Sequence, residues 1–253
     1  MVWGMYLPST GGAFGPYGKE EGTGAGINMK SGWGDRLQAH YQSQSPEIGQ
    51  AMWGDDWDSP DNIVDYPHKV VKKFQYEIGR KTLGDPWEIA APIQPHEPPS
   101  YYLTEKSFAQ LGSIISLTDR KWAMDEAAKS VIEELEPGLH QFYRLDIRMP
   151  RNQTYPVPFY TFVCGQWLES FSPQDTMPGS FKEYNSNGIT WYQFFESKAV
   201  ISGLAMRKSV FKGAHCWRER GFNEKLVCFS EEAIGRLNDA GCILPKHYRM
   251  NEV

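Results

Sequence analysis

The sequence predicts an α+β fold in which capped amphipathic helices pack on a mainly antiparallel sheet, and three patterns favour it. Two segments, 102–111 and 228–237, each combine the end of a strand, a hydroxyl-bearing helix cap and a glutamate in the first helical turn. Apolar and polar residues alternate in segments between residues 142 and 195, as in half-buried strands. Apolar residues from Met124 to Leu135 recur in steps of four, three, one and three, the spacing of an amphipathic helix.

The N-terminal third differs from the rest of the chain in composition. The first 34 residues hold ten of the 24 glycines and little aliphatic periodicity, which is typical of a loop-rich or mobile arm. A proline-rich segment, 84–100, follows as an extended connector. We therefore expect a glycine-rich, acidic N-terminal arm or lobe over residues 1–85 and an α+β domain over residues 86–253.

The elements of the second part can be predicted in order. A short strand ends at Leu103, and Thr104 would then cap a helix over Glu105–Ile115. The next helix is expected to begin near Thr118 and to stop at Pro137-Gly138. Four further strands are predicted, at Phe142–Ile147, Val157–Cys164, Gly188–Phe195 and Lys225–Phe229. The last strand leads into a helix that begins at Ser230, and its likeness to segment 102–111 favours two related strand–helix units on one sheet.

Composition and charge exclude several functional classes. Hydrophobic residues make up 40% of the 253 residues, which indicates a folded protein. The net charge of −5 argues against a nucleic-acid partner, because phosphate binding needs a cationic surface. The sequence shows no signal-peptide pattern at its N-terminus and no window close to the roughly 20 apolar residues of a membrane span. We expect a cytoplasmic protein with no membrane partner.

The cysteine spacing argues against a disulfide framework and against a metal centre. The four cysteines, Cys164, Cys216, Cys228 and Cys242, form no Cys-x-x-Cys pair. A zinc site made from the last three with His247 would lack a close-spaced ligand pair. We therefore expect reduced, mostly buried thiols, with no metal and no cofactor.

Two charged segments are candidates for a binding surface. Residues 35–66 carry seven acidic residues and one arginine, whereas residues 67–81 carry a net charge of +4. The acidic run is either a solvated loop beside a basic helix, which is the more economical interpretation, or a patch that docks a cationic partner. Segment 206–225, with a net charge of +4, is either solvated surface or half of a protein interface, because tryptophan and arginine are favoured in interfaces. The candidate partner-binding residues are Trp53, Asp55, Asp56, Trp57, Asp58, Asp61, Asp65, Trp217 and Arg218.

Two motifs in the second part resemble a known family. The first is Glu136-Pro-Gly-Leu-His-Gln-Phe142, within residues 131–142. The second, within residues 210–241, is Gly213-x-His-x-Trp-Arg218 followed by Phe229-Ser-Glu and Ala240-Gly241. Together they resemble the immunity-eleven family, the cognate inhibitors of bacterial polymorphic toxins, over residues 87–247.

The resemblance implies a bacterial immunity protein whose partner is a cognate protein toxin. Its α+β immunity-like domain would be residues 86–253, and the protein would neutralise the toxin by occluding the toxin's active site. The family offers no catalytic residue to carry over. The resemblance gives equal support to two roles for the family's recurring residues, structural anchors or toxin contacts. In this chain these residues are His140, His215, Trp217 and Arg218.

Two other functional classes compete with this interpretation. An enzyme, such as a hydrolase that reverses a toxin's modification, would need convergent ionisable groups in a deep pocket. No catalytic motif is visible, and the adjacent His215 and Cys216 would point to opposite faces of a strand. A structural interaction module of a larger assembly is the third possibility.

Overall fold

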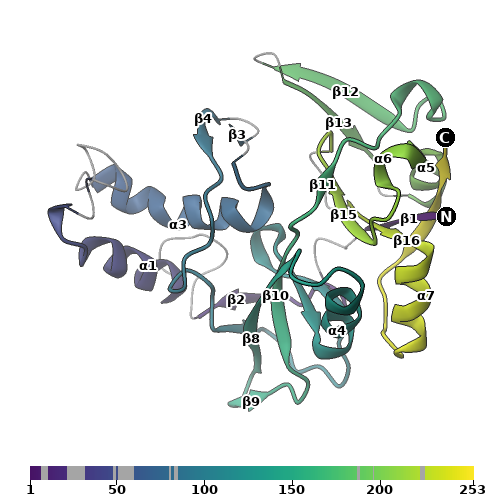
Figure 1. The fold of residues 1–253 in the computed structure, drawn as a ribbon. Helices are drawn as coiled ribbons and strands as arrows, with labels where there is room; N and C mark the ends of the chain where they lie inside the picture. Colours follow the sequence, from purple (N-terminus) through teal and green to yellow (C-terminus); the bar gives the residue numbers. More distant parts are fainter. Residues whose placement is uncertain are drawn as a thin grey trace.

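The computed structural model describes most of the chain (Figure 1). The described residues are 1–6, 11–21, 32–47, 50, 60–79, 81–82, 85–186, 189–195, 197–222 and 226–253. Helices and sheets are both present, so the α+β class predicted from the sequence is confirmed.

A six-stranded C-terminal sheet contains both ends of the chain. Its strands, in spatial order, are β11 (Trp167–Leu168), β15 (Cys216–Glu219), β16 (Leu226–Ser230), β1 (Val2–Tyr6), β17 (His247–Glu252) and β14 (Ala205–Met206). The two termini lie side by side in Figure 1, and the amino group of Met1 pairs with Glu252 Oε1 at 2.8 Å.

The position of β1 differs from the expectation of a loop-rich arm. This strand lies between β16 and β17 and pairs antiparallel with both. Gly4 allows this close packing, because a Cβ there would lie 3.0 Å from the side chains of Ile201, Leu226 and Met250. The first residues therefore belong to the C-terminal sheet, while the division at residue 85 stays a prediction.

A second, central sheet contains the predicted strands of the middle of the chain. Its order is β2 (Gly18–Glu20), β5 (Tyr101–Thr104), β8 (Gln141–Met149), β10 (Phe159–Val163), β7 (Trp122–Asp125) and β6 (Ile114–Ser116), with β9 (Gln153–Thr154) on β8. Both large sheets are mixed: β5–β8, β11–β15 and β14–β17 are parallel pairs, and the other pairs are antiparallel.

Within the described part of the chain, two hairpins lie outside the two large sheets. The first joins β3 (Lys81–Thr82) to β4 (Asp85–Ile89), and the second joins β12 (Phe181–Ser186) to β13 (Ile189–Phe194). In Figure 1 the β12–β13 hairpin projects from the C-terminal part of the molecule. A single bridge, Tyr192 to Phe222, connects its backbone to the region that follows β15.

The helices with described bounds are α1 (Gly32–Gln42), α3 (Pro60–Gln75), α4 (Glu126–Leu135), α5 (Lys198–Gly203), α6 (Lys208–Phe211) and α7 (Glu231–Asp239), with short 3-10 turns at Thr118–Arg120 and Pro173–Asp175. The helix expected at Ser230 is α7, and Ser230 Oγ accepts a hydrogen bond from Ala233 N–H at 3.0 Å. In α4 the cap is Asp125, which accepts from Ala128 N–H at 2.9 Å.

Two predictions for the middle of the chain are wrong. The helix expected from Thr118 begins only at Glu126, because the preceding β7 is inserted between β6 and β10 and its first three residues are buried. The helix expected over Glu105–Ile115 is absent: residues 105–113 are irregular and are followed by β6.

Distant groups replace the helix hydrogen bonds in segment 105–113. Leu111 N–H donates to the Tyr155 hydroxyl at 2.9 Å, and Gly112 N–H donates to the Ala13 carbonyl at 2.9 Å. Gly112 also packs against the Phe14 ring, where a Cβ would lie only 2.3 Å away. Because Thr104 lies in β5 and caps no helix, the idea of two related strand–helix units is wrong as well.

One hydrophobic core joins the two large sheets. Met5, Val227 and Phe229 of the C-terminal sheet pack in the same cluster as Trp122 and Phe162 of the central sheet, together with the inner faces of α4 and α7. Helices α1 and α3 form a separate cluster against Val163 at the other side of the molecule. Among the described residues, no helix is both long enough and apolar enough to cross a lipid bilayer.

Candidate functional site

The two motifs of the sequence meet at Glu136, the residue that ends α4. Its Oε1 accepts from His215 N–H at 2.7 Å and from the Gln166 amide at 3.0 Å. Its Oε2 accepts from Cys216 N–H at 3.0 Å and lies 2.8 Å from His140 Nε2. Burial opposes ionisation of this carboxyl, but the hydrogen bonds from His140 and His215 outweigh it and hold the pKa of Glu136 below its usual value.

The Glu136 carboxylate therefore connects segments that are far apart in sequence. His140 accepts a hydrogen bond from Gly165 N–H on Nδ1 at 3.2 Å, so the ring presents its Nε2–H to Glu136. The connection joins the end of α4 to the start of β15 in the C-terminal sheet. We conclude that His140 is a structural anchor.

Trp217 also has a structural position. The indole is 0% exposed, stacks on Phe211 at 5.2 Å and donates from Nε1 to Ser170 Oγ at 3.3 Å. A partner cannot contact this side chain without opening the core, so its burial does not support the predicted role in toxin binding. The neighbouring Arg218 is half-buried, with its guanidinium 5.0 Å from the centroid of the Trp167 ring.

The acidic candidates cannot be placed as a group. Trp53, Asp55, Asp56, Trp57 and Asp58 lie outside the described residues, and the two remaining aspartates, Asp61 and Asp65, lie in α3 with side chains outside the described part. In the basic segment that follows, residues 67–81, one lysine has a role other than balancing the acidic run. Lys73 is buried and pairs with Glu97 at 2.5 Å, inside the cluster formed by α1 and α3.

The four cysteines are free thiols and all are buried, as expected. Cys216 and Trp217 of β15 pair with Phe229 and Cys228 of β16, in the interior of the C-terminal sheet. Within the described residues, no group of three potential ligands is arranged to hold a metal ion.

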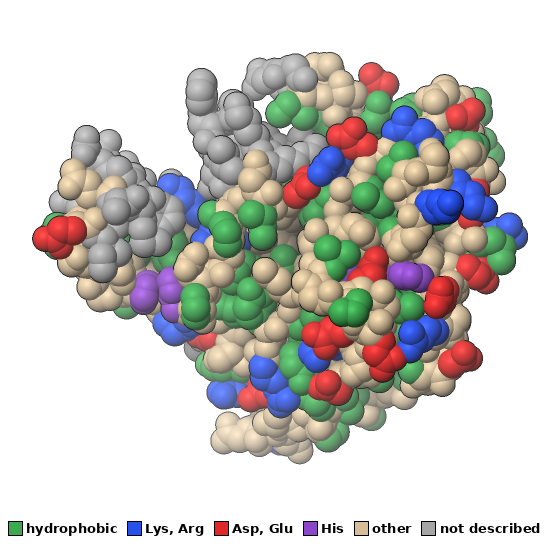
Figure 2. Space-filling model, viewed as in Figure 1, with side chains coloured by type: hydrophobic (Ala, Val, Ile, Leu, Met, Phe, Trp, Pro, Cys, Tyr) green, Lys and Arg blue, Asp and Glu red, His purple; other side chains and the backbone are tan. Residues whose placement is uncertain are grey.

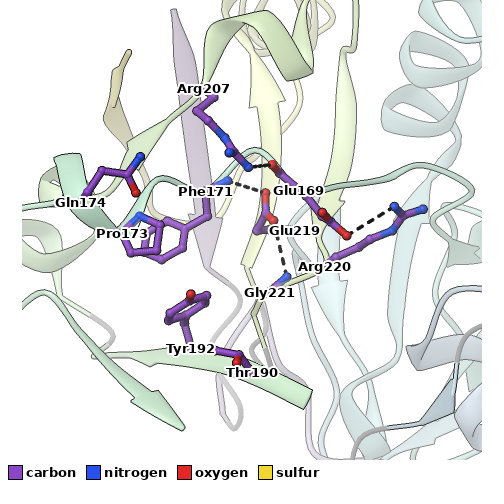
Figure 3. Close-up of a pocket in the computed structure, with 10 residues that line it drawn as sticks. All are labelled: Glu169, Phe171, Pro173, Gln174, Thr190, Tyr192, Arg207, Glu219, Arg220 and Gly221. Atoms are coloured by element: carbon purple, nitrogen blue, oxygen red, sulfur yellow. Dashed lines mark hydrogen bonds and ion pairs between the residues drawn. The ribbon is translucent and has the colours of Figure 1, made fainter. Parts of the chain in front are cut away.

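A pocket that the sequence motifs do not indicate lies between the β12–β13 hairpin and the end of β15 (Figure 3). Its volume is about 380 Å³, which is in the range of small-ligand sites. The hairpin forms one wall, and the segment after β11 forms another. The lining residues are Glu169, Phe171, Pro173, Gln174, Thr190, Tyr192, Arg207, Glu219, Arg220 and Gly221.

Glu219 is the buried acid of this pocket, with 3% of its surface exposed. Its Oε2 accepts hydrogen bonds from Ser170 N–H at 2.7 Å, Ser170 Oγ–H at 2.7 Å and Phe171 N–H at 3.0 Å. Among the residues that the structure describes, its Oε1 accepts one hydrogen bond, a long one from Gly221 N–H at 3.4 Å. Burial raises the pKa of Glu219 to about 7, although these hydrogen bonds oppose the change.

The two arginines of the pocket have partners at its rim. Arg220 binds both carboxylate oxygens of Glu77, at 2.8 and 2.6 Å, and its Nη1 lies 3.7 Å from Glu169 Oε1. Arg207 donates to the backbone carbonyl of Glu169. The side chain of Glu169 itself is 71% exposed.

Aromatic rings make the pocket wall rigid. Phe171 lies at the centre of this group, 5.0 Å from Tyr192 and 4.8 Å from Phe222. Tyr192 is also 5.5 Å from Phe181 on the other strand of the hairpin. These contacts fix the inner face of the hairpin against the body of the protein.

No sequence motif predicts this pocket, because its walls come from four segments separated by up to 50 residues. Two predicted segments contribute to its lining: the strand Gly188–Phe195 through Thr190 and Tyr192, and the basic segment 206–225 through Arg207, Glu219, Arg220 and Gly221. On the face shown in Figure 2, acidic and basic side chains are interspersed.

No protein-family model matches this chain, and no curated protein matches it.

Proposed function

We propose that this chain is an immunity protein that binds a cognate bacterial toxin and occludes the toxin's active site. One observation carries the proposal: the two segments that resemble the immunity-eleven family form a single structural unit. Glu136 of the first segment accepts hydrogen bonds from His215 and Cys216 of the second. The helices of the two segments, α4 and α7, are also linked by an ion pair between Glu134 and Arg236.

The shared buried carboxylate joins the two segments into one scaffold, which is what the proposal needs from them. In the proposal, α4, α7 and the antiparallel strand pairs form the rigid scaffold, and the toxin binds to the surface that the scaffold presents. The protein would act in the bacterial cytoplasm without a cofactor, a metal, a nucleic acid or a membrane.

The outer face of the β12–β13 hairpin offers anchors for such an interface. Tyr184 stacks on Trp191 with ring centroids 4.3 Å apart, and Tyr184 is 37% exposed. Phe195, directly after the hairpin, is 57% exposed. Exposed aromatic side chains held by stacking lose little conformational entropy on binding, which makes them effective interface residues.

The hydrolase remains the second candidate, because one observation favours it. Glu219 lies in a pocket and has a pKa raised to about 7, a property of general acids and bases. Its Oε2 is held by three donors, however, so the carboxylate has only one oxygen with free capacity. A hydrolase would restore the toxin's modified target and would need no stable complex with the toxin.

The test uses the toxin gene that the proposal expects next to the gene of this protein. Co-expression should restore growth of a strain that carries the toxin, and the two proteins should co-purify as an equimolar complex. Failure of co-expression to restore growth would refute the immunity function. Restoration without any complex, together with repair of the modified target, would replace occlusion by the hydrolase.

A further inference from the structure

We infer that the pocket between the β12–β13 hairpin and β15 binds the guanidinium group of an arginine side chain that a protein partner inserts. The inference rests on the proposed function only in identifying the partner as the toxin. The pocket chemistry is an independent property of this chain.

Acceptors with unused capacity dominate the pocket. Glu219 is buried, and within the described residues its Oε1 accepts one hydrogen bond, a long one from Gly221 N–H at 3.4 Å. A buried carboxylate oxygen usually has stronger donors than this, so the site can take at least one more N–H group. The exposed carboxylate of Glu169 is a second acceptor at the rim, in addition to its ion pair with Arg220 at 3.7 Å (Figure 3).

Both arginines of the pocket already have partners, one a carboxylate and the other a backbone carbonyl. Glu77 binds Arg220 through both of its oxygens, and the carbonyl of Glu169 binds Arg207. When Glu219 is ionised, and with Glu77 at the rim included, three carboxylates face two guanidinium groups. The local charge therefore favours a cationic ligand over a phosphate or a carboxylate.

The shape of the walls favours a guanidinium group over an ammonium group. Phe171 and Tyr192 line the pocket and pack edge to face, with ring centroids 5.0 Å apart, and Thr190 lies on the same strand as Tyr192. A planar guanidinium stacks on aromatic rings and donates in several directions at once. A single ammonium point charge cannot reach a buried acceptor and a rim acceptor together with the same geometry.

The first experiment titrates the full chain with N-acetyl-arginine N-methylamide, whose ends are uncharged, and follows backbone amide shifts by NMR. The expected result is saturable binding with a Kd on the order of 1 mM, with the largest shifts at Thr190, Tyr192 and Gly221. The citrulline analogue has nearly the same shape but no charge, and we expect it to bind about tenfold more weakly. The lysine analogue should also bind more weakly.

Two substitutions locate the site, and a third is the control. Glu219→Gln should weaken arginine binding about tenfold, and the exposed Glu169→Gln should weaken it about threefold without affecting the fold. Glu105→Gln changes an exposed carboxylate outside the pocket and should leave binding unchanged. Any of four results would overturn the inference: no saturable binding of the arginine compound, equal binding of the citrulline analogue, tighter binding of inorganic phosphate, or pocket variants that bind the arginine compound as tightly as the unchanged protein.

The same variants separate this inference from the proposed function. If the chain neutralises its toxin but does not bind the arginine compound, the pocket inference fails and the immunity function stands. If the arginine compound binds as expected but the toxin is neither bound nor neutralised, the immunity proposal fails and the pocket assignment stands.

Discussion

Replacement of Glu136 by glutamine tests whether the motif residues hold the two large sheets together. The carboxylate accepts hydrogen bonds from His140, Gln166, His215 and Cys216. Glutamine keeps one acceptor oxygen and turns the other into an NH₂ group that faces two N–H donors. Two hydrogen bonds are lost, and two buried donors are left without a partner.

The cost follows from the value of each lost bond. An unsatisfied buried donor costs about 1–3 kcal/mol, so the two donors left by Glu136→Gln should lower the free energy of unfolding by about 2–6 kcal/mol. That is a large part of the about 5–15 kcal/mol by which a typical domain is stable. The pH dependence should change as well. The pKa of Glu136 is lower in the folded protein than in the unfolded chain. The stability that the ionised carboxylate contributes is therefore fully present above its pKa in the unfolded chain and is lost as the pH falls through its pKa in the folded protein.

Urea unfolding followed by tryptophan fluorescence and circular dichroism measures this effect as a lower midpoint at an unchanged m-value. The matched control is Glu134→Gln, two residues earlier, where the side chain is 62% exposed and pairs with Arg236 at the surface. That change should cost less than about 1 kcal/mol. If the two variants lose the same stability, the reasoning about the Glu136 network is refuted.

Three further predictions concern the pocket acid, the buried tryptophan and the acidic run. The pKa of Glu219 is raised from 4.5 to about 7, so the folded protein binds the proton more tightly than the unfolded chain, and the free energy of unfolding should fall by about 3 kcal/mol as the pH rises through this window. Urea titrations at several pH values should show that Glu219→Gln removes this pH dependence, and an unchanged pH dependence in the variant would contradict the prediction. Trp217→Ala should cost about 3–5 kcal/mol, so protection should disappear only under conditions in which circular dichroism shows unfolding; loss of protection by a fully folded variant would show a direct contact. Reversal of Asp55, Asp56 and Asp58 to Lys should slow toxin association and weaken its salt dependence in stopped-flow measurements, whereas unchanged kinetics would place the interface elsewhere.

Local signals in the sequence predicted several elements correctly. Ser230 caps α7 as expected, because its hydroxyl needs only a neighbouring backbone N–H. Gly138 has a φ of 71°, and the expected end of the helix at Pro137-Gly138 reflects this left-handed conformation. These features depend on residues that are close in the chain.

Features that depend on distant residues could not be predicted. The segment after Thr104 has the pattern of a capped helix, but Tyr155 and Ala13 satisfy its backbone and Phe14 fills the space beside Gly112. Helix propensity is a weak preference that such tertiary contacts override. The pocket has the same origin, since Glu169 and Glu219 meet only because β11 and β15 pair in parallel.

The measurement that tests the central claim most directly is the toxin's activity in vitro as a function of the molar ratio of this protein. An occluding inhibitor that binds tightly should reduce the activity in proportion to its amount and abolish it at equimolar concentration. Full activity above the equimolar point would contradict immunity by binding. Recovery of the modified target at a small fraction of the toxin's concentration would contradict occlusion and would show turnover.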